Sequence, residues 1–433
     1  MRRSFGFLMS VSSVALFGGT LLLSAPAFGQ SQATSEVDGG ASDPSTIAQT
    51  EIGEIVVTAR RRNESLQSVP VSINAFDTAA MESRSIRTTT DLTQASPGLR
   101  FSSEGTTYTS SVSMRGLGKN AAATTGTPAV VVYFAEVPVP GDNLNIPTYD
   151  LASIQVLKGP QGTLFGRNTI GGAILIAPAR PSFDFSGYMR GTYGNYDYKA
   201  LEGAINLPLI DDVAALRIAG QIRRRDGYVQ DLSYGDRLDD VNQNSVRASL
   251  LLEPAENFSN TTIFDYFDAS EKGNGYILFR VNHLPGLEFL DGPLDDALAA
   301  QQTGGIRRTR SAVPDPYTKP RFWGITNITE WQLGNIELKN IFGYRVNDIR
   351  IRGNFDGLPP LFDDDVALYK TLAARNNDRS ISDEFQAQGK MLGGRLDFIV
   401  GAFYSKLEPN GVRGITNRSF DLIGPSTLVA PLT

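Results

Sequence analysis

The stretch Leu157-Lys158-Gly159-Pro160-Gln161-Gly162-Thr163-Leu164-Phe165-Gly166-Arg167-Asn168-Thr169-Ile170-Gly171-Gly172-Ala173-Ile174 decides the fold of this chain. It places five glycines between two apolar runs that have the composition of β-strands. Glycine adopts backbone conformations that other residues avoid, and it lets two backbones approach closely. The stretch therefore predicts tight turns and close packing between neighbouring strands.

Two more segments belong with this stretch: Arg115-Gly116-Leu117-Gly118, and the run from Asp150 to Pro160. Together they resemble the plug domain of TonB-dependent outer-membrane receptors. The resemblance implies a mixed α/β plug domain over residues 63–181, followed by an antiparallel transmembrane β-barrel, and a lumen carboxylate as the partner of Arg115. The matching residues are Arg115, Gly116, Gly118, Gly159, Gly162, Gly166, Arg167, Asn168, Gly171 and Gly172.

The chain departs from the family pattern at Phe134-Ala135-Glu136, where an aspartate-glycine turn is more usual. The geometry of that hairpin is therefore open at this point. Elsewhere in the domain, alternating runs predict strands near residues 69–76, 112–115, 129–134, 154–157 and 173–177. Helical patterns cover 78–85 and 90–95, and Pro97-Gly98 ends the second helix.

The first 53 residues carry targeting signals. Residues 1–29 have two arginines, an apolar run and small residues near Ala25 and Ala27, which favours a cleaved export signal peptide over a retained membrane anchor. Residues 30–53 are rich in Ser, Thr, Ala, Gly and Asp, and this composition predicts a disordered tether.

A short β-prone segment, residues 54–62, follows the tether and resembles the TonB box. An extended segment on a flexible tether suits strand addition to the sheet of a partner. The resemblance implies a TonB-type periplasmic energy-transducing protein as that partner, and the alternative is that residues 55–57 form the first internal strand of the plug. The expected contact residues are Glu54, Ile55, Val56, Val57, Thr58, Ala59 and Arg60.

From residue 182 onward the hydrophobic period is two. Apolar and polar residues alternate in segments of about ten residues, which is typical of transmembrane barrel strands that enclose a wet lumen. A soluble β-sandwich alternates equally well, but here short turns and long loops fall at opposite ends, as they do in outer-membrane barrels. About nine strands are expected, near 187–194, 199–209, 213–224, 244–253, 258–268, 322–333, 336–347, 380–392 and 395–406.

Barrels plugged by a separate domain run to about 22 strands, so about nine strands cannot close around one. Residues 182–433 are therefore expected to be the N-terminal part of a larger barrel.

Composition argues against an enzyme. The chain has no cysteine and a single histidine, His283, so histidine-based catalytic pairs and clustered metal sites are not expected. Residues 116–121 match a dinucleotide fingerprint, but the following segment is too short for a crossover helix. Residues 166–172 have the glycine spacing of a phosphate loop with Gly172 in place of its lysine. No cofactor or metal is expected, and a net charge of −6 argues against nucleic acid as a partner.

The resemblance implies an outer-membrane receptor of a Gram-negative cell that takes up a scarce ligand, such as a ferric siderophore or another small organic nutrient, with energy from TonB. A plug-bearing signalling receptor and a passive porin-like channel are the alternatives. One long loop supplies candidate ligand contacts, although lipopolysaccharide contact or plain solvation would also account for them. These candidates are Tyr276, Phe279, Arg280 and His283.

Overall fold

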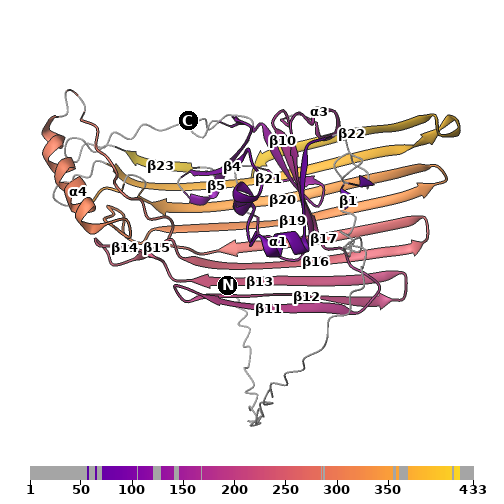
Figure 1. The fold of residues 1–433 in the computed structure, drawn as a ribbon, viewed down its shortest axis with the longest axis horizontal. Coiled ribbons are helices and arrows are strands. Elements are labelled where there is room, and N and C mark those ends of the chain that lie inside the picture. The colour runs from indigo at the N-terminus through magenta and orange to yellow at the C-terminus, as the bar shows by residue number, and fades with distance from the viewer. Residues whose placement is uncertain are drawn as a thin grey trace, which may run out of the picture. The chain divides into compact units, whose positions relative to one another are not determined.

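The computed structural model describes residues 56–57, 64–65, 71–104, 106–119, 128–140, 146–166, 168–283, 285, 288–354, 357–359, 369–411 and 414–419. All of them lie in one compact unit, Glu54–Thr433. This unit contains an α/β domain, called the plug from here on, and a long antiparallel sheet, called the wall sheet (Figure 1). The predicted signal peptide and tether lie outside the described residues.

The plug is built on a five-stranded mixed sheet in the order β3-β9-β10-β7-β8. Its neighbours are antiparallel except for β10 and β7, which run parallel. The strands are β3 (Ile73–Asp77), β7 (Val130–Phe134), β8 (Val137–Pro138), β9 (Leu151–Lys158) and β10 (Gly172–Pro178). The helices are α1 (Thr78–Ser83), η2 (Thr89–Asp91), α2 (Leu92–Ala95) and α3 (Gly162–Phe165).

Two small sheets complete the plug region. One has the order β4-β5-β6, with β4 (Leu99–Glu104), β5 (Thr106–Met114) and β6 (Leu117–Gly118). The other pairs β1 (Val56–Val57) with β2 (Glu64–Ser65). The expected strands and helices of the plug are thus all present, within a few residues of the predicted bounds.

The plug has its own hydrophobic core. Leu92, Met114, Ile154 and Ile174 are fully buried within it. Gly172, at φ +148°, shows why the glycine-rich stretch matters, because a Cβ there would lie 2.2 Å from the Leu157 carbonyl oxygen. Glycine at this position therefore allows β9 and β10 to pack against the β5 strand end.

We expect the plug to fold without the wall sheet, since its core is formed almost wholly from its own residues. Residues 63–181 expressed alone should be soluble and should protect the amides of β9 and β10 from hydrogen exchange. A spectrum in which every amide exchanges at the unfolded rate would show instead that the plug depends on the wall for its stability.

The wall sheet has the order β11-β12-β13-β16-β17-β19-β20-β21-β22, and β23 pairs with β21. All neighbours are antiparallel, and β11 and β22 each have one neighbour among the described residues, so the described sheet is open. Its strands are β11 (Ser186–Gly194), β12 (Tyr198–Ile210), β13 (Ala214–Arg225), β16 (Val241–Ala255), β17 (Phe258–Ala269), β19 (Tyr317–Leu333), β20 (Ile336–Gly353), β21 (Tyr369–Met391), β22 (Leu396–Pro409) and β23 (Gly414–Ser419).

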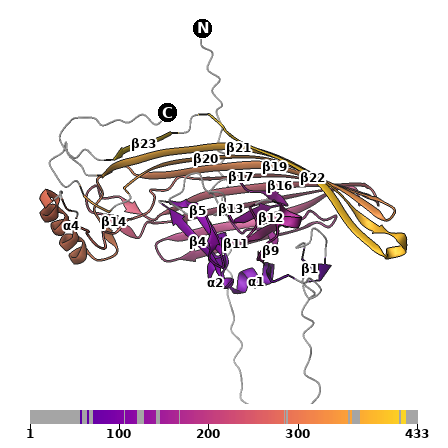
Figure 2. The ribbon, with the colours of Figure 1, turned by 90° about the horizontal axis from the view of Figure 1, so that it is seen from above.

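The two faces of the wall sheet differ as the alternation predicts. On the outward parity, Leu201, Ile205, Ile218 and Ile222 are exposed apolar side chains. On the inward parity, polar side chains such as Asn206, Arg247, Lys339 and Arg345 are buried. The plug lies on this polar face (Figure 2). In the described part of the chain, none of the helices is long and apolar enough to span a membrane.

The nine predicted wall strands are confirmed, but several extend further than expected toward the long loops. We call the strand ends that carry the long loops the loop end of the wall sheet, and the opposite strand ends the turn end (Figure 1). In the extension of β20 the apolar residues, Ile349 and Ile351, change to the inward parity and so depart from the pattern of the preceding segment, while backbone pairing continues regardless of side-chain type.

The long loops also contain unpredicted structure. It comprises β14 (Val229–Asp231), β15 (Arg237–Leu238), β18 (Arg308–Thr309), η3 (Glu288–Leu290) and α4 (Asp291–Gly304), and η4 (Leu392–Gly394) lies at the turn end.

Candidate functional site

Besides a partly exposed ion pair between Glu82 of α1 and Arg190 of β11, the plug and the inner face of the wall meet in three further sets of contacts, and the first is at the loop end. Tyr108 of β5 is fully buried, and its hydroxyl donates to Oε1 of Glu271 at 3.0 Å. The Gln243 side-chain amide donates to the Tyr108 hydroxyl at 2.8 Å and to the same Glu271 oxygen at 2.9 Å. Phe267 and Phe322 pack against the Tyr108 ring. A plug strand is thus fixed to the base of the long loops by a buried polar group.

Burial raises the pKa of Glu271 to about 7, and the three hydrogen bonds that its carboxylate accepts oppose this rise. Burial also raises the pKa of Tyr108 well above its ordinary value. Tyr108 is therefore a donor at all physiological pH values, whereas Glu271 changes its charge near neutrality.

The second set of contacts lies midway along the wall and is an ion pair. Arg217 of β13 donates to both oxygens of Asp150, at 2.9 and 2.5 Å. The Asp150 side chain is 3% exposed and the Arg217 side chain 14% exposed. Asp150 directly precedes β9 and has φ +49°, a conformation that aspartate and asparagine tolerate better than most residues. A buried, bidentate pair of this kind fixes both position and orientation.

Two wall arginines hold the plug hairpin beside this pair. Phe134, at the end of β7, has the guanidinium of Arg247 4.9 Å and that of Arg345 5.1 Å from its ring centroid. Arg247 also donates to the carbonyl oxygens of Tyr149 and Asp150. Both arginines are buried, and a desolvated cation–π contact is worth about 2 kcal/mol.

The position of Arg345 depends on a glycine. The Arg345 guanidinium donates to Asp265 of β17 at 3.2 Å, although β19 lies between their strands. Gly324 of β19 faces both residues, and a Cβ there would lie 3.1 Å from the Arg345 side chain. Glycine at position 324 therefore lets the arginine cross a neighbouring strand.

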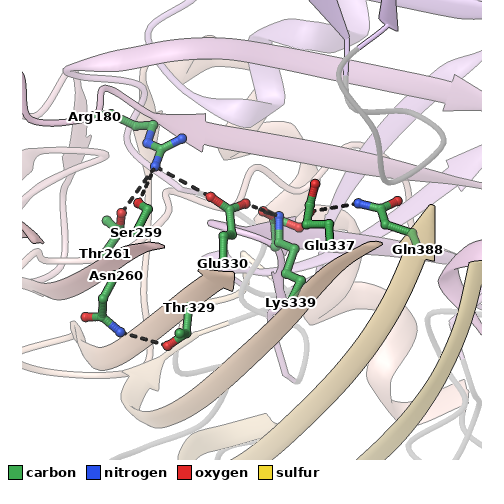
Figure 3. Close-up of polar contacts among 10 residues, drawn as sticks. Arg180, Ser259, Asn260, Thr261, Thr329, Glu330, Glu337, Lys339 and Gln388 are labelled. Atoms are coloured by element: carbon green, nitrogen blue, oxygen red, sulfur yellow. Dashed lines mark hydrogen bonds and ion pairs between the residues drawn. The ribbon is translucent and has the colours of Figure 1, made fainter. Parts of the chain in front are cut away.

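The third set of contacts is a chain of charges at the turn end. Lys339 is buried, and its Nζ lies 2.7 Å from Glu136 Oε1 of the plug and 2.9 Å from Glu330 Oε1 of β19. Glu330 also lies 3.8 Å from Arg180, which follows the last plug strand (Figure 3). The Arg180 guanidinium reaches Ser259 and Thr261 at 3.5 Å. The buried lysine is thus held between two carboxylates, one from each domain.

The hairpin left open by the sequence forms in a two-residue turn. Ala135 has φ +47° and Glu136 φ +66°, and Phe134 pairs with Val137 across them. Two consecutive positive φ values define a type I′ turn, in which glycine or asparagine is preferred. Glu136 therefore occupies a strained position, and its ion pair with Lys339 offsets that strain.

A cavity of about 1290 Å³ borders this charge chain at the turn end. Plug residues such as Phe165 and Leu175 line one side, and wall residues such as Glu337 and Trp331 line the other. Lys339 and Arg180 are also in the lining. In Figure 3 the Gln388 amide donates to Glu337 on the same inner face, at 2.8 Å. The wall side of this cavity is therefore charged, and its plug side is largely apolar.

The glycine motif of the plug gathers around Arg115, but the expected carboxylate partner is not found there. Within the described residues, the Arg115 guanidinium donates to Ser72 Oγ at 3.3 Å, and a Cβ on Gly159 would lie 3.8 Å from Arg115 Nη1. Arg115 is exposed and has φ +51°. The expected pairing with a lumen carboxylate is therefore wrong in this structure. The plug carboxylates that pair with the wall are Asp150, Glu136 and Glu82 instead.

The remaining glycines fall into two groups. Gly116, Gly159 and Gly166 have positive φ and serve turns. Gly118 and Gly171 have close neighbours, because a Cβ on Gly118 would lie 2.5 Å from that of Ser113, and one on Gly171 3.1 Å from the Ala129 carbonyl oxygen. Gly162 begins α3 with open space around it, Asn168 has φ +67°, and Arg167 lies outside the described residues.

The predicted ligand residues do not converge on one pocket. Tyr276 is half-buried, lines a small pocket with Thr309 and Gly357, and has its pKa raised to about 12 by burial. Phe279 is 90% exposed, and Arg280 is exposed. His283 hydrogen-bonds Asp295 of α4 at 3.1 Å. Within the described residues, no cluster of three or more His, Asp or Glu side chains fits a metal ion.

The segment predicted to bind an energy-transducing partner is described at two residues. Val56 and Val57 pair with Ser65 and Glu64, separate from the five-stranded plug sheet. The other five predicted contact residues, at 54–55 and 58–60, lie outside the described residues.

Sequence reasoning placed Arg217, Arg247, Lys339 and Arg345 on the polar parity of their strands, but it did not find their plug partners. The sequence shows only that charged residues lie on the inward parity of the strands. This pattern indicates a wet lumen and a charged partner equally well. To tell a wet lumen from a charged partner, one must know that Asp150 pairs with Arg217 and Glu136 with Lys339. No local pattern encodes these long-range pairs.

Comparison with known proteins agrees with this architecture. Residues 65–173 match the family model of the TonB-dependent receptor plug domain. The pesticin receptor of Yersinia pestis is 28% identical over 152 residues, which cover 35% of this chain and 22% of that protein. The iron-regulated outer membrane virulence protein of Vibrio cholerae is 27% identical over 194 residues, which cover 42% of this chain and 29% of that protein.

Solved receptors share the fold of both domains. The ferric yersiniabactin uptake receptor FyuA of Yersinia pestis superposes with a TM-score of 0.64 at 18% identity, covering 78% of this chain and 48% of that one. The pyoverdine outer membrane receptor FpvA of Pseudomonas aeruginosa gives a TM-score of 0.64 at 16% identity, covering 86% and 53%. The chain thus spans about half the length of these solved receptors. Residues 65–173 are therefore similar to the plug domain of TonB-dependent receptors, and the plug and the strands that follow it share the fold of solved outer-membrane receptors.

Proposed function

We propose that this protein is an outer-membrane receptor that takes up a scarce ligand into the periplasm with energy supplied by a TonB-type protein. One observation carries the proposal. The plug has its own hydrophobic core and is held on the polar face of the wall sheet, whose other face is apolar. An apolar outer face suits lipid, and a polar inner face occupied by a folded domain makes passage conditional on movement of that domain.

Energy enters at residues 54–60 by main-chain pairing with the periplasmic partner. This segment lies ahead of β3, an edge strand of the plug sheet, so force applied there reaches the plug at an edge. The plug–wall contacts resist that force, and they consist of hydrogen bonds, ion pairs and ring contacts that can break and form again.

The ligand class is proposed from the relatives. The matched structures include receptors for ferric yersiniabactin and pyoverdine, so a metal chelate carried by a small organic molecule is the first class to test. The long loops at the loop end, including Tyr276, Phe279, Arg280 and His283, are the proposed contact region. An exported location in the outer membrane is supported by residues 1–29, whose composition is that of a signal peptide.

The test is uptake of ⁵⁵Fe loaded onto the host's own secreted siderophores, in cells with and without the intact gene and with and without a protonophore. The proposal expects uptake that is lost in both the deletion strain and the protonophore-treated cells. Gene-dependent uptake that resists the protonophore would favour the passive channel. Gene-dependent transcription without any gene-dependent uptake would favour the signalling receptor.

A further inference from the structure

Glu271 lies at the start of a long loop, residues 270–316, which the structure describes in part. It pairs with the strand that follows the loop. Its backbone N–H donates to the Thr318 carbonyl oxygen at 3.0 Å, and the Thr318 N–H donates back at 2.8 Å. Thr318 is the second residue of β19, the strand that follows the loop, so this reciprocal pair ties the two loop ends together. The Glu271 side chain points from the same position to the plug, where it accepts from Tyr108.

Aromatic packing joins the same three segments. Phe267 lies two residues before the end of β17, ahead of the loop, and Phe322 lies in β19 after it. Their rings stack with centroids 5.6 Å apart, and both contact the Tyr108 ring, at 5.8 and 6.5 Å. A shift of either loop end therefore changes the surroundings of Tyr108, because close-packed interiors do not deform smoothly.

Tyr108 belongs to a strand that reaches the N-terminal part of the plug. β5 continues from Tyr108 to Met114, a span of about 20 Å at 3.3 Å per residue. Arg115 follows directly, and its guanidinium donates to Ser72 Oγ. Ser72 immediately precedes β3, the plug-sheet strand nearest in sequence to residues 54–62. One extended strand thus connects the base of the outer loop to the start of the plug sheet.

We propose that Tyr108 and Glu271 are positioning residues that couple the state of the 270–316 loop to the segment ahead of β3, through strand β5 and the Arg115–Ser72 hydrogen bond. This inference rests on the proposed function, since it assigns the route by which a ligand at the loops acts on the N-terminal segment. The coupling itself is a property of the folded receptor without ligand or partner.

Hydrogen exchange of the natural receptor in detergent, with no ligand and no periplasmic partner, tests the coupling separately from uptake. Tyr108→Phe should raise exchange about fivefold or more in residues 106–114 and also in residues 71–77, because a buried hydrogen bond is lost while the ring remains. Tyr266→Phe, on the outward parity of β17, is the matched control and should change neither segment.

A second variant identifies the route. Arg115→Met should raise exchange in residues 71–77, and Tyr108→Phe should then add nothing further there, because both changes act on one connection. If Tyr108→Phe changes residues 106–114 alone, or if the two effects on residues 71–77 simply add, the coupling is overturned. That result would leave the uptake proposal standing.

The protonation of Glu271 gives an independent arm. Its pKa in the folded protein, about 7, lies above its ordinary value of 4.5, so its stabilising contribution is present when it is protonated and is lost as pH rises through 7. Arg223 and Asp240 also act on this cluster, the first on Tyr108 and the second on Glu271. Protection of residues 106–114 and 71–77, corrected for intrinsic rates, should fall together between pH 6 and pH 8. Glu271→Gln, which stays neutral and still accepts from Tyr108, should remove this pH dependence in both segments, and a pH response that survives in Glu271→Gln would contradict the assignment.

Discussion

Replacing Val56 with proline in the natural receptor should lower energised uptake by about tenfold or more, to the level of a strain without the gene. Val56 lies in β1, the part of the partner-binding segment that the structure describes, and it is already extended there. Strand addition depends on backbone donors and acceptors more than on side chains. Proline removes the N–H at this position and prevents the ladder from forming across it.

The matched control is Val56→Ala, which removes more of the apolar side chain than proline does but keeps the backbone donor. It should retain most of the uptake. Binding of the labelled siderophore mixture to cells at 4 °C should be unchanged in both variants, because the loop end of the receptor is untouched. Uptake at the normal rate by the proline variant would remove residues 54–60 from the energy-coupling role.

The wall sheet could be predicted from sequence because its signal is local. A strand in contact with an apolar medium on one side and a polar interior on the other must alternate, and a shift of one residue would reverse both faces. All nine predicted strands are therefore found. At the loop end of β20 the alternation continues, but Ile349 and Ile351 lie on the inward parity and are buried, because the neighbour there is the ring cluster around Tyr108 and not the polar interior.

The contacts between plug and wall could not be predicted, because they join residues far apart in the chain. Lys339 and Glu136 are 203 positions apart, and Arg217 and Asp150 are 67 apart. Arg115 illustrates the difficulty from the other side. Its motif indicated a carboxylate partner, but its position beside Gly98 and Gly159 directs the guanidinium to Ser72.

The same reasoning explains the turn geometry that the sequence left open at Ala135 and Glu136. From local preferences alone, a glutamate in a positive-φ turn is unfavourable, by about 1 kcal/mol or more. The residue is acceptable here because its carboxylate meets a buried lysine from a strand two hundred residues later. Local sequence–structure conflicts of this kind mark positions where a distant contact determines the residue.

The ion pair between Asp150 and Arg217 should contribute most to the seating of the plug. Asp150→Asn keeps the shape and tolerates the same positive φ, but it leaves the buried Arg217 guanidinium without a counter-charge, which costs about 3 kcal/mol. The plug of the detergent-solubilised natural receptor should then become protease-sensitive at a clearly lower urea concentration, as measured by pulse proteolysis. Asp197→Asn is the matched control, because Asp197 pairs with Lys199 at the exposed β11–β12 turn.

The control variant should show the wild-type urea midpoint, since exposed pairs contribute little to stability. Replacing both partners of the buried pair, as Asp150→Asn with Arg217→Met, should recover part of the loss, because no unpaired charge then remains in the interface. Equal midpoints for Asp150→Asn and Asp197→Asn would show that the pair does not hold the plug. The seat would then have to depend on the other plug–wall contacts, namely the Tyr108–Glu271 hydrogen bond, the arginine contacts to Phe134 and the Glu136–Lys339 pair, whose own substitutions can be measured in the same assay.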